Sequence, residues 1–176
     1  MLVTLRDTLQ KALKNNYAVA GLVTLGWEDM MAYVEAAEKE NCPVILQAGP
    51  SCRQHTPLPV LGKMFNYLAE NTYVPVVAHL DHGYTQEECK IAVDSGFSSI
   101  MFDGSKKTLN ENIDETAKIC KFNIGTELRS SFGNALREAV NVDPERFDRV
   151  QILKDTHEPL VEKTRSVLRA FKAVNS

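Results

Sequence analysis

Short runs of apolar residues alternate along the chain with segments in which apolar residues recur every three or four positions. Continuous apolar runs are typical of buried strands, whereas the three-to-four spacing is typical of amphipathic helices. The runs predict strands at 18–22, 43–48, 75–79, 98–102 and 120–124. The helical spacing predicts helices at 5–13, 27–40, 60–71, 109–117, 130–140 and 157–174, with further helices capped by Thr85 and opened by Asp143-Pro144.

Strands that are continuously apolar and are each followed by a helix indicate a parallel sheet covered by helices. Such units fit either a doubly wound sheet or a β/α barrel. Polar residues occur where the predicted strands end, namely Gln47, Asp81, His82 and Asp103. Active sites lie at this end of the strands in both architectures. The first strand is followed by no GxGxxG motif, which disfavours a nucleotide-binding sheet.

One junction does not fit a complete fold. The helix predicted up to Ile119 runs straight into the strand predicted from Cys120, with no glycine, proline or polar turn between them. A helix-to-strand connection normally takes about 2–6 residues. An eight-stranded barrel also needs about 250 residues, far more than the strands available here can supply. We therefore expect whole β/α units to be absent between Ile119 and Cys120.

Composition narrows the class of protein. The 176 residues are 44% hydrophobic and 24% charged, which is typical of one globular domain. A net charge of −3 without a basic block gives no support for nucleic-acid binding, and no apolar run approaches the length of a membrane span. The start of the chain has no secretory pattern. The cysteines form no CxxC pair, so we expect small apolar fillers in a reduced, cytoplasmic protein.

The candidate chemistry lies at residues 74–83 (VPVVAHLDHG), where an apolar run ends in ionisable groups. Burying charge is costly, so such a cluster is usually functional. Asp81 can exchange a proton and His82 can bind a metal; the alternatives are a helix cap or salt bridge for Asp81 and a structural role for His82. His79 is three residues from His82 and should face the other side of the strand, in a structural or supporting role. We expect His55, in a polar loop, and His157 to be solvated.

Three segments of the chain, taken in order, resemble the class II, metal-dependent ketose-bisphosphate aldolases. They are PVVAHLDHG at 75–83, SGFSSIMFDGS at 95–105 followed by ENI at 111–113, and KFNIGTELR at 121–129. The resemblance runs from about Leu5 to Ala173 and implies a TIM-type (β/α)8 barrel. Strands one to four and eight are recognisable, and strands five to seven would be missing at the junction described above. The chain is then one incomplete β/α-barrel domain, with a half-barrel at 1–119 and the last strand and C-terminal helices at 120–176.

The resemblance implies reversible cleavage of a ketose 1,6-bisphosphate, of the fructose or tagatose type, into dihydroxyacetone phosphate and an aldehyde. It assigns proton transfer to Asp81 and ligation of Zn²⁺ to His82. Substrate contacts would come from Asn123, Gly125 and Thr126, with Ser51 as a further contact.

Several assignments stay open. Asp103 is a candidate either for binding a second mono- or divalent cation or for capping Ser105, and Arg129 either for a phosphate or for a helix surface. Val23 stands where many relatives have asparagine, which leaves tagatose bisphosphate or another ketose phosphate as an alternative to fructose bisphosphate. Two further histidine ligands, a glutamate and glycine-rich phosphate loops have no counterpart here. The alternative function is therefore a non-catalytic, aldolase-like remnant or partner protein. The resemblance also suggests a homo-oligomer, either a dimer or a tetramer.

Overall fold

The computed structural model describes residues 1–103, 121–124 and 126–170. Its strands are β1 (Val19–Thr24), β2 (Val44–Ala48), β3 (Val76–Gly83), β4 (Ser99–Phe102) and β5 (Lys121–Ile124). Its helices are α1 (Leu5–Lys14), α2 (Trp27–Lys39), α3 (Pro50–His55), α4 (Leu58–Glu70), α5 (Gln86–Asp94), α6 (Thr126–Val142) and α7 (Arg149–Ala170). None of the helices in these ranges is both long and apolar enough to cross a bilayer.

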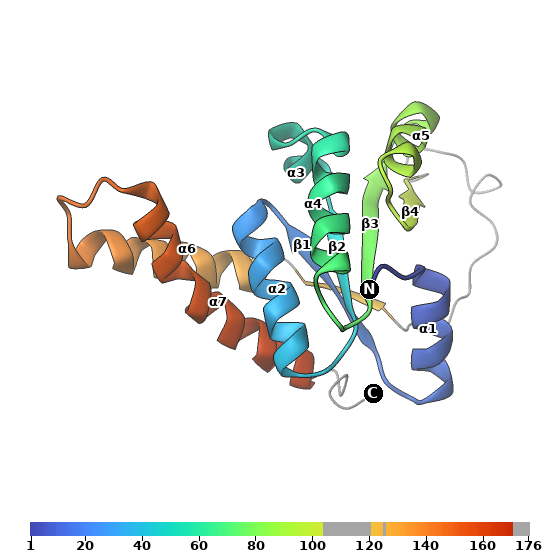
Figure 1. Ribbon diagram of the computed structural model, residues 1–176, viewed down its shortest axis with the longest axis horizontal. Coiled ribbons are helices and arrows are strands. Elements are labelled where there is room, and N and C mark those ends of the chain that lie inside the picture. Colours follow the sequence, from blue (N-terminus) through green and yellow to red (C-terminus); the bar gives the residue numbers. More distant parts are fainter. Residues whose placement is uncertain (104–120, 125, 171–176) are drawn as a thin grey trace.

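The five strands form one parallel sheet in the order β4-β3-β2-β1-β5 (Figure 1). The predicted parallel α/β architecture is therefore confirmed. β5, the last strand in the sequence, pairs with β1, the first, and Asn123 is aligned with Gly21. A first strand that pairs with the last is the relation by which a β/α barrel closes.

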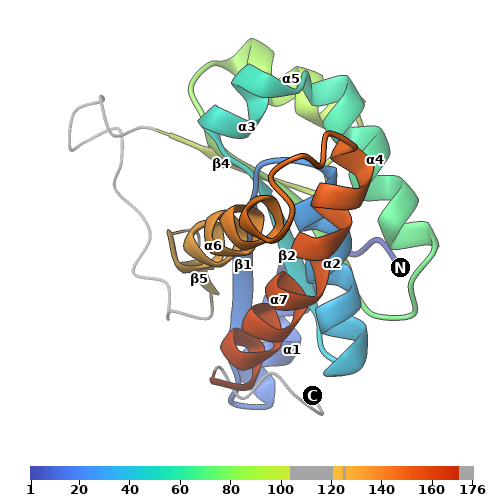
Figure 2. The same cartoon turned by 90° about the vertical axis from the view of Figure 1, so that its left-hand side faces the viewer.

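The strands β1, β2 and β3 are buried on both faces, whereas β4 is partly exposed. The alternate residues Val44, Leu46 and Ala48 join the main core, which lies under α2, α4 and α7. Figure 2 shows α2 and α7 lying side by side. Ile45 and Val77 belong to a second cluster on the opposite face, where they pack with residues of α1. Because side chains alternate along a strand, Asp81 belongs to the same face of β3 as Val77. Burial on both faces explains why β1, β2 and β3 are largely continuous apolar runs.

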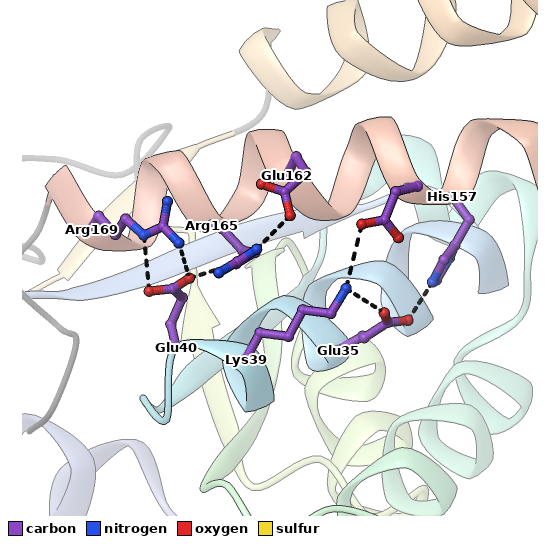
Figure 3. Close-up of polar contacts among 8 residues, drawn as sticks. Glu35, Lys39, Glu40, His157, Glu162, Arg165 and Arg169 are labelled. Atoms are coloured by element: carbon purple, nitrogen blue, oxygen red, sulfur yellow. Dashed lines mark hydrogen bonds and ion pairs between the residues drawn. The ribbon is translucent and has the colours of Figure 1, made fainter.

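Ion pairs connect α2 to α7 along a seam (Figure 3). Glu40, which is 5% exposed, accepts hydrogen bonds from Arg165 Nε at 2.5 Å and from Arg169 Nη2 at 2.7 Å. Nearer the start of α7, His157 Nε2 lies 2.5 Å from Glu35 Oε2. The prediction that His157 is solvated is therefore wrong, because the long α7 carries it against α2.

The C-terminal helices differ from the prediction at their starts. No helix opens at Asp143-Pro144; residues 143–148 form a turn and irregular chain, and α7 begins at Arg149 rather than at 157. The reason is a competing cap, because Asp148 Oδ1 accepts hydrogen bonds from the backbone N–H groups of Val150 and Gln151. α6 begins at Thr126, four residues earlier than expected. The helix predicted at 109–117 and the junction at 119–120 lie outside the described residues.

The cysteines of the described ranges are free, and Cys42 and Cys52 are buried. Burial raises the pKa of the Cys42 thiol to about 12 and raises the pKa of Cys52 and Cys89 as well. A raised pKa disfavours the reactive thiolate. These three residues therefore behave as the predicted apolar fillers, whereas Cys120 lies outside the described ranges.

Candidate active site

The end of β3 departs from regular strand geometry where the ionisable cluster begins. The pairing of β3 with β4 shifts register between Leu80 and Gly83, so that three steps along β3 match two along β4. Within this irregularity His82 has a φ of 56°. A left-handed backbone costs a residue other than glycine about 1–2 kcal/mol. Such irregularities re-aim side chains and are frequent beside active sites.

Asp81 is buried at the carboxyl end of β3, with 5% exposure. Gly49, just after β2, lies beside it, because a Cβ built on Gly49 would be 3.8 Å from Asp81 Oδ2 and 3.9 Å from Val23 Cγ1. In the described part of the chain, no hydrogen bond or ion pair reaches the Asp81 carboxylate. Neither a helix cap nor a salt bridge is realised there for Asp81, and Thr85 caps α5 instead.

His82 pairs with Asp103 in the geometry of a prepared metal ligand. Nδ1 lies 2.8 Å from Asp103 Oδ2, and the His82 side chain is 41% exposed. Since a carboxylate accepts, Nδ1 is the donor in this pair, and Nε2 is the ring nitrogen that the pair does not use. Carboxylate–histidine pairs of this kind fix the tautomer and the ring orientation of metal-bound histidines. Two roles are predicted for Asp103 from the sequence, binding a cation or capping Ser105. The structure adds a third role, which is to orient the imidazole of His82.

The other histidines lie apart from His82. His79 is 2% exposed and hydrogen-bonds Ser99 Oγ through Nδ1 at 2.8 Å, as a structural residue would. His55 is exposed but closes α3 rather than lying in a loop. Residues 1–103, 121–124 and 126–170 contain no group of three or more potential metal ligands. His82 is therefore a candidate for one metal ligand, and these residues hold no complete ligand set.

Arg53, on α3, is not among the residues predicted from the sequence, yet it donates hydrogen bonds to three backbone carbonyls at the site. Its terminal nitrogens donate to the carbonyl oxygens of Asp81 at 2.7 Å, His82 at 2.8 Å and Ala48 at 2.8 Å. Its Nε donates to Glu88 Oε1 at 2.7 Å, and the side chain is only 6% exposed. No spacing rule could have pointed to Arg53, because its main acceptors are backbone carbonyls that any sequence provides.

The predicted substrate residues of the described ranges lie in or just after the carboxyl-terminal parts of the parallel strands β2 and β5. Ser51 is exposed on α3, and Gly49 is the residue after β2 that approaches Asp81. Asn123 belongs to β5 beside β1, and Thr126 is the first residue of α6. Gly125 lies outside the described residues. Arg129 is exposed on α6.

Comparison with known proteins gives a consistent result. Residues 3–120 match the family model described as fructose-bisphosphate aldolase class-II. A fructose-bisphosphate aldolase of Helicobacter pylori (strain J99) is 30% identical over 167 residues, which cover 93% of this chain and 54% of that protein. A 6-phospho-5-dehydro-2-deoxy-D-gluconate aldolase of Bacillus licheniformis is 37% identical over 123 residues, which cover 68% of this chain and 42% of that protein. The chain thus spans about half the length of the curated relatives it matches.

Solved structures show the same fold. The YdjI aldolase from Escherichia coli K12 superposes with a TM-score of 0.85 at 18% identity, covering 99% of both chains. The fructose-bisphosphate aldolase from Campylobacter jejuni superposes with a TM-score of 0.80 at 14% identity, covering 99% of this chain and 96% of that one. These likenesses confirm the predicted TIM-type barrel fold, of which the described sheet is a part.

Proposed function

The chain belongs to the class II fructose-bisphosphate aldolase family, and from this premise we propose that it acts as a metal-dependent aldolase. The proposed reaction is reversible cleavage of a ketose 1,6-bisphosphate into dihydroxyacetone phosphate and an aldehyde. The single observation that carries the proposal is the buried carboxylate of Asp81 at the carboxyl end of β3, in the residue that precedes His82, whose imidazole is paired with Asp103. Active sites of β/α barrels lie at that end.

Asp81 is proposed as the group that exchanges a proton with the substrate hydroxyl at the carbon–carbon bond being broken or made. A general acid or base must lie within hydrogen-bond reach of that proton. With no side-chain partner in the described residues, the carboxylate keeps its lone pairs for a substrate. The proximity of the Asp81 carboxylate to Gly49, just after β2, supports a reacting carbon near that strand end.

His82 is proposed as one ligand of a divalent metal, Zn²⁺ in the first instance, through Nε2. A metal bound there would polarise the substrate oxygens as a Lewis acid. The proton on Nδ1, held by Asp103, keeps the imidazole in the tautomer that leaves Nε2 open. A catalytic zinc needs about three protein ligands, so the others would come from outside the described residues. A second mono- or divalent cation belongs to the same proposal.

The substrate is proposed to be a phosphorylated sugar of the fructose or tagatose type. Asn123, Gly125 and Thr126 are proposed to contact dihydroxyacetone phosphate, and Ser51 is a further candidate contact. Val23 has no amide to offer to the sugar, so the choice between the two ketoses is left to experiment. We further propose a single barrel domain, divided into 1–119 and 120–176, that acts as a cytoplasmic homo-oligomer.

The test is a cleavage assay on the full-length protein. Fructose 1,6-bisphosphate and tagatose 1,6-bisphosphate are each supplied, and triose phosphate is measured with a coupled dehydrogenase. We expect one of them to be cleaved, activity to fall on chelation, and Zn²⁺ to restore it. If the zinc-supplemented protein cleaves neither substrate, the aldolase proposal fails and a non-catalytic, aldolase-like role takes its place.

A further inference from the structure

We propose that Arg53 is a positioning residue of the active site, which holds the backbone of Asp81 and His82 in the conformation that presents both side chains. This inference rests on the proposed function for its catalytic readout. Within the described residues, Arg53 makes no hydrogen bond or ion pair with the side chain of either Asp81 or His82. It acts through main-chain carbonyls and is itself oriented by Glu88.

The hydrogen bonds of Arg53 converge on one short stretch of chain. Consecutive carbonyl oxygens, those of Asp81 and His82, accept from Nη1 and Nη2 at 2.7 and 2.8 Å. Nη1 also donates to the carbonyl of Ala48, the last residue of β2, at 2.8 Å. A guanidinium presents its N–H donors in a rigid planar fork, so the three acceptors are fixed relative to one another. The ends of β2 and β3 are thereby tied together.

The hydrogen bonds from Arg53 reach the part of β3 whose backbone is left-handed at His82. His82 has its φ of 56° inside the register shift between Leu80 and Gly83, where regular pairing with β4 is interrupted. A left-handed residue persists only when its surroundings hold it in place. Bonds to the carbonyls of Asp81 and His82 fix the peptide on either side of the His82 Cα, and so they fix the direction of its side chain.

Glu88, on α5, binds the Nε group of Arg53 and so orients the guanidinium. Its Oε1 accepts from Arg53 Nε at 2.7 Å, and its Oε2 accepts from the backbone N–H of Tyr84 at 2.8 Å. Glu88 lies in the first turn of α5, whose cap Thr85 accepts from the Glu88 N–H. The Glu88 carboxylate thus joins Arg53 to the backbone at the start of α5. The guanidinium is therefore held between α5 and the ends of two strands.

The test uses the full-length protein with three variants. Arg53→Lys keeps the charge but loses the planar fork, and Glu88→Gln keeps an acceptor but loses its charge. Arg137→Lys on α6 is the matched control, because Arg137 is exposed and contacts Asn134 on its own helix. We expect kcat of Arg53→Lys to fall about 10- to 100-fold, as is typical when the groups that orient a ligating histidine are changed. KM should stay within about twofold, since substrate contacts are unchanged. Glu88→Gln should show a smaller fall, and Arg137→Lys none.

A second readout does not depend on activity. Two-dimensional ¹H–¹⁵N spectra report the ring nitrogens of the histidines, and the His82 signals are assigned by their loss in His82→Gln. We expect the His82 signals to move in Arg53→Lys and, less, in Glu88→Gln, while those of His157 stay fixed. A merely structural tie would lower the melting temperature and leave both kcat and the His82 signals of the folded protein unchanged.

The outcomes separate the two proposals. If the wild type cleaves no ketose bisphosphate, the proposed function fails, and the His82 signals still decide the role of Arg53. If Arg53→Lys does not fold, Glu88→Gln carries the test alone. A folded variant with unchanged His82 signals would overturn the inference even if kcat fell, because Arg53 would then act elsewhere.

Discussion

Two histidine–carboxylate pairs in this molecule consist of the same types of side chain but use different ring nitrogens of the histidine. At the end of β3, His82 uses Nδ1 to hold Asp103 at 2.8 Å. In the α2–α7 seam, His157 uses Nε2 to hold Glu35 at 2.5 Å (Figure 3). The first pair leaves the outer ring nitrogen Nε2 open, whereas the second consumes it. The same residue types therefore make the pair of the proposed metal ligand in one place and a helix-to-helix contact in the other.

The arginines show the same contrast. In the seam, Arg165 and Arg169 give their donors to the buried carboxylate of Glu40. At the sheet edge, Arg53 gives most of its donors to backbone carbonyls. The charge of Glu40 is thereby neutralised, whereas the Asp81 carboxylate has no side-chain partner in the described residues. The proposal that chemistry takes place at the end of β3 therefore rests on the pattern of partners rather than on the residue types.

The largest expected effect is that of Asp81→Asn. The change removes a proton-transfer group, so we expect kcat to fall about 10²- to 10⁴-fold. The melting temperature should not fall, because a buried carboxylate without a partner costs free energy in the folded state. Steady-state cleavage and a thermal melt give the two values. Undiminished turnover would show that the unpaired carboxylate is idle.

Gly83→Ala should damage the end of β3 next most strongly. A Cβ on Gly83 would lie 2.8 Å from Cys89 Sγ and 2.9 Å from Leu80 Cδ2, closer than such atoms approach. We expect a loss of about 1–3 kcal/mol in unfolding free energy from overpacking. The matched control is Gly133→Ala in α6, where the nearest atom of Arg137 is 3.6 Å away. That variant should gain about 0.4–1 kcal/mol. Equal effects of the two changes in denaturant melts would contradict the tight packing at Gly83.

Glu40→Gln is the counterpart of Asp81→Asn in the seam. It keeps the shape of the side chain but removes the charge that two arginines share. Because those arginines are partly in solvent, screening should limit the loss to about 1 kcal/mol, or about 2–4 °C in melting temperature. We expect kcat to stay at the wild-type value. A catalytic defect in a fully folded Glu40→Gln protein would contradict the view that the α2–α7 ion pairs affect stability alone.

The smallest expected effect is the pH dependence of the stability that the α2–α7 ion pairs contribute. Burial alone would raise the pKa of Glu40, but hydrogen bonds from Arg169 and Arg165 outweigh it and lower that pKa below its ordinary value of 4.5. The hydrogen bond from His157 lowers the pKa of Glu35 in the same direction. An acid with a lowered folded-state pKa contributes stability that is present above its unfolded pKa and is lost as the pH falls through the folded pKa. Melting temperatures measured below pH 4.5 should therefore fall less steeply for Glu40→Gln than for wild type, and parallel curves would contradict this.

The centre of the sheet could be predicted from the sequence because β1, β2 and β3 are buried on both faces and so are largely continuous apolar runs. The strand predicted at 43–48 differs from β2, Val44–Ala48, by one residue. The start of α7 could not be predicted, since Asp143-Pro144 and Asp148 are competing local signals and only the fold decides between them. Asp81 and His82 stood out as charges at the end of an apolar run, and their roles stay predictions.

The rest of the candidate site depends on contacts between residues distant in sequence. Arg53 reaches carbonyls 28 and 29 positions away and a carboxylate 35 positions away. Its acceptors are mostly main-chain atoms, which leave no pattern in the sequence. The pairing of His157 with Glu35 likewise appears only when α7 is laid along α2. Periodicity therefore predicts the strands and helices well and the arrangement of polar partners poorly.

The contrast between the two histidines gives the most direct test of the account. Full-length wild type, His82→Ala and His157→Ala are loaded with Zn²⁺, dialysed against metal-free buffer and analysed by elemental mass spectrometry. The account predicts that His157→Ala retains the zinc content of the wild type while His82→Ala loses the metal. Equal zinc content in all three proteins, or loss confined to His157→Ala, would contradict it.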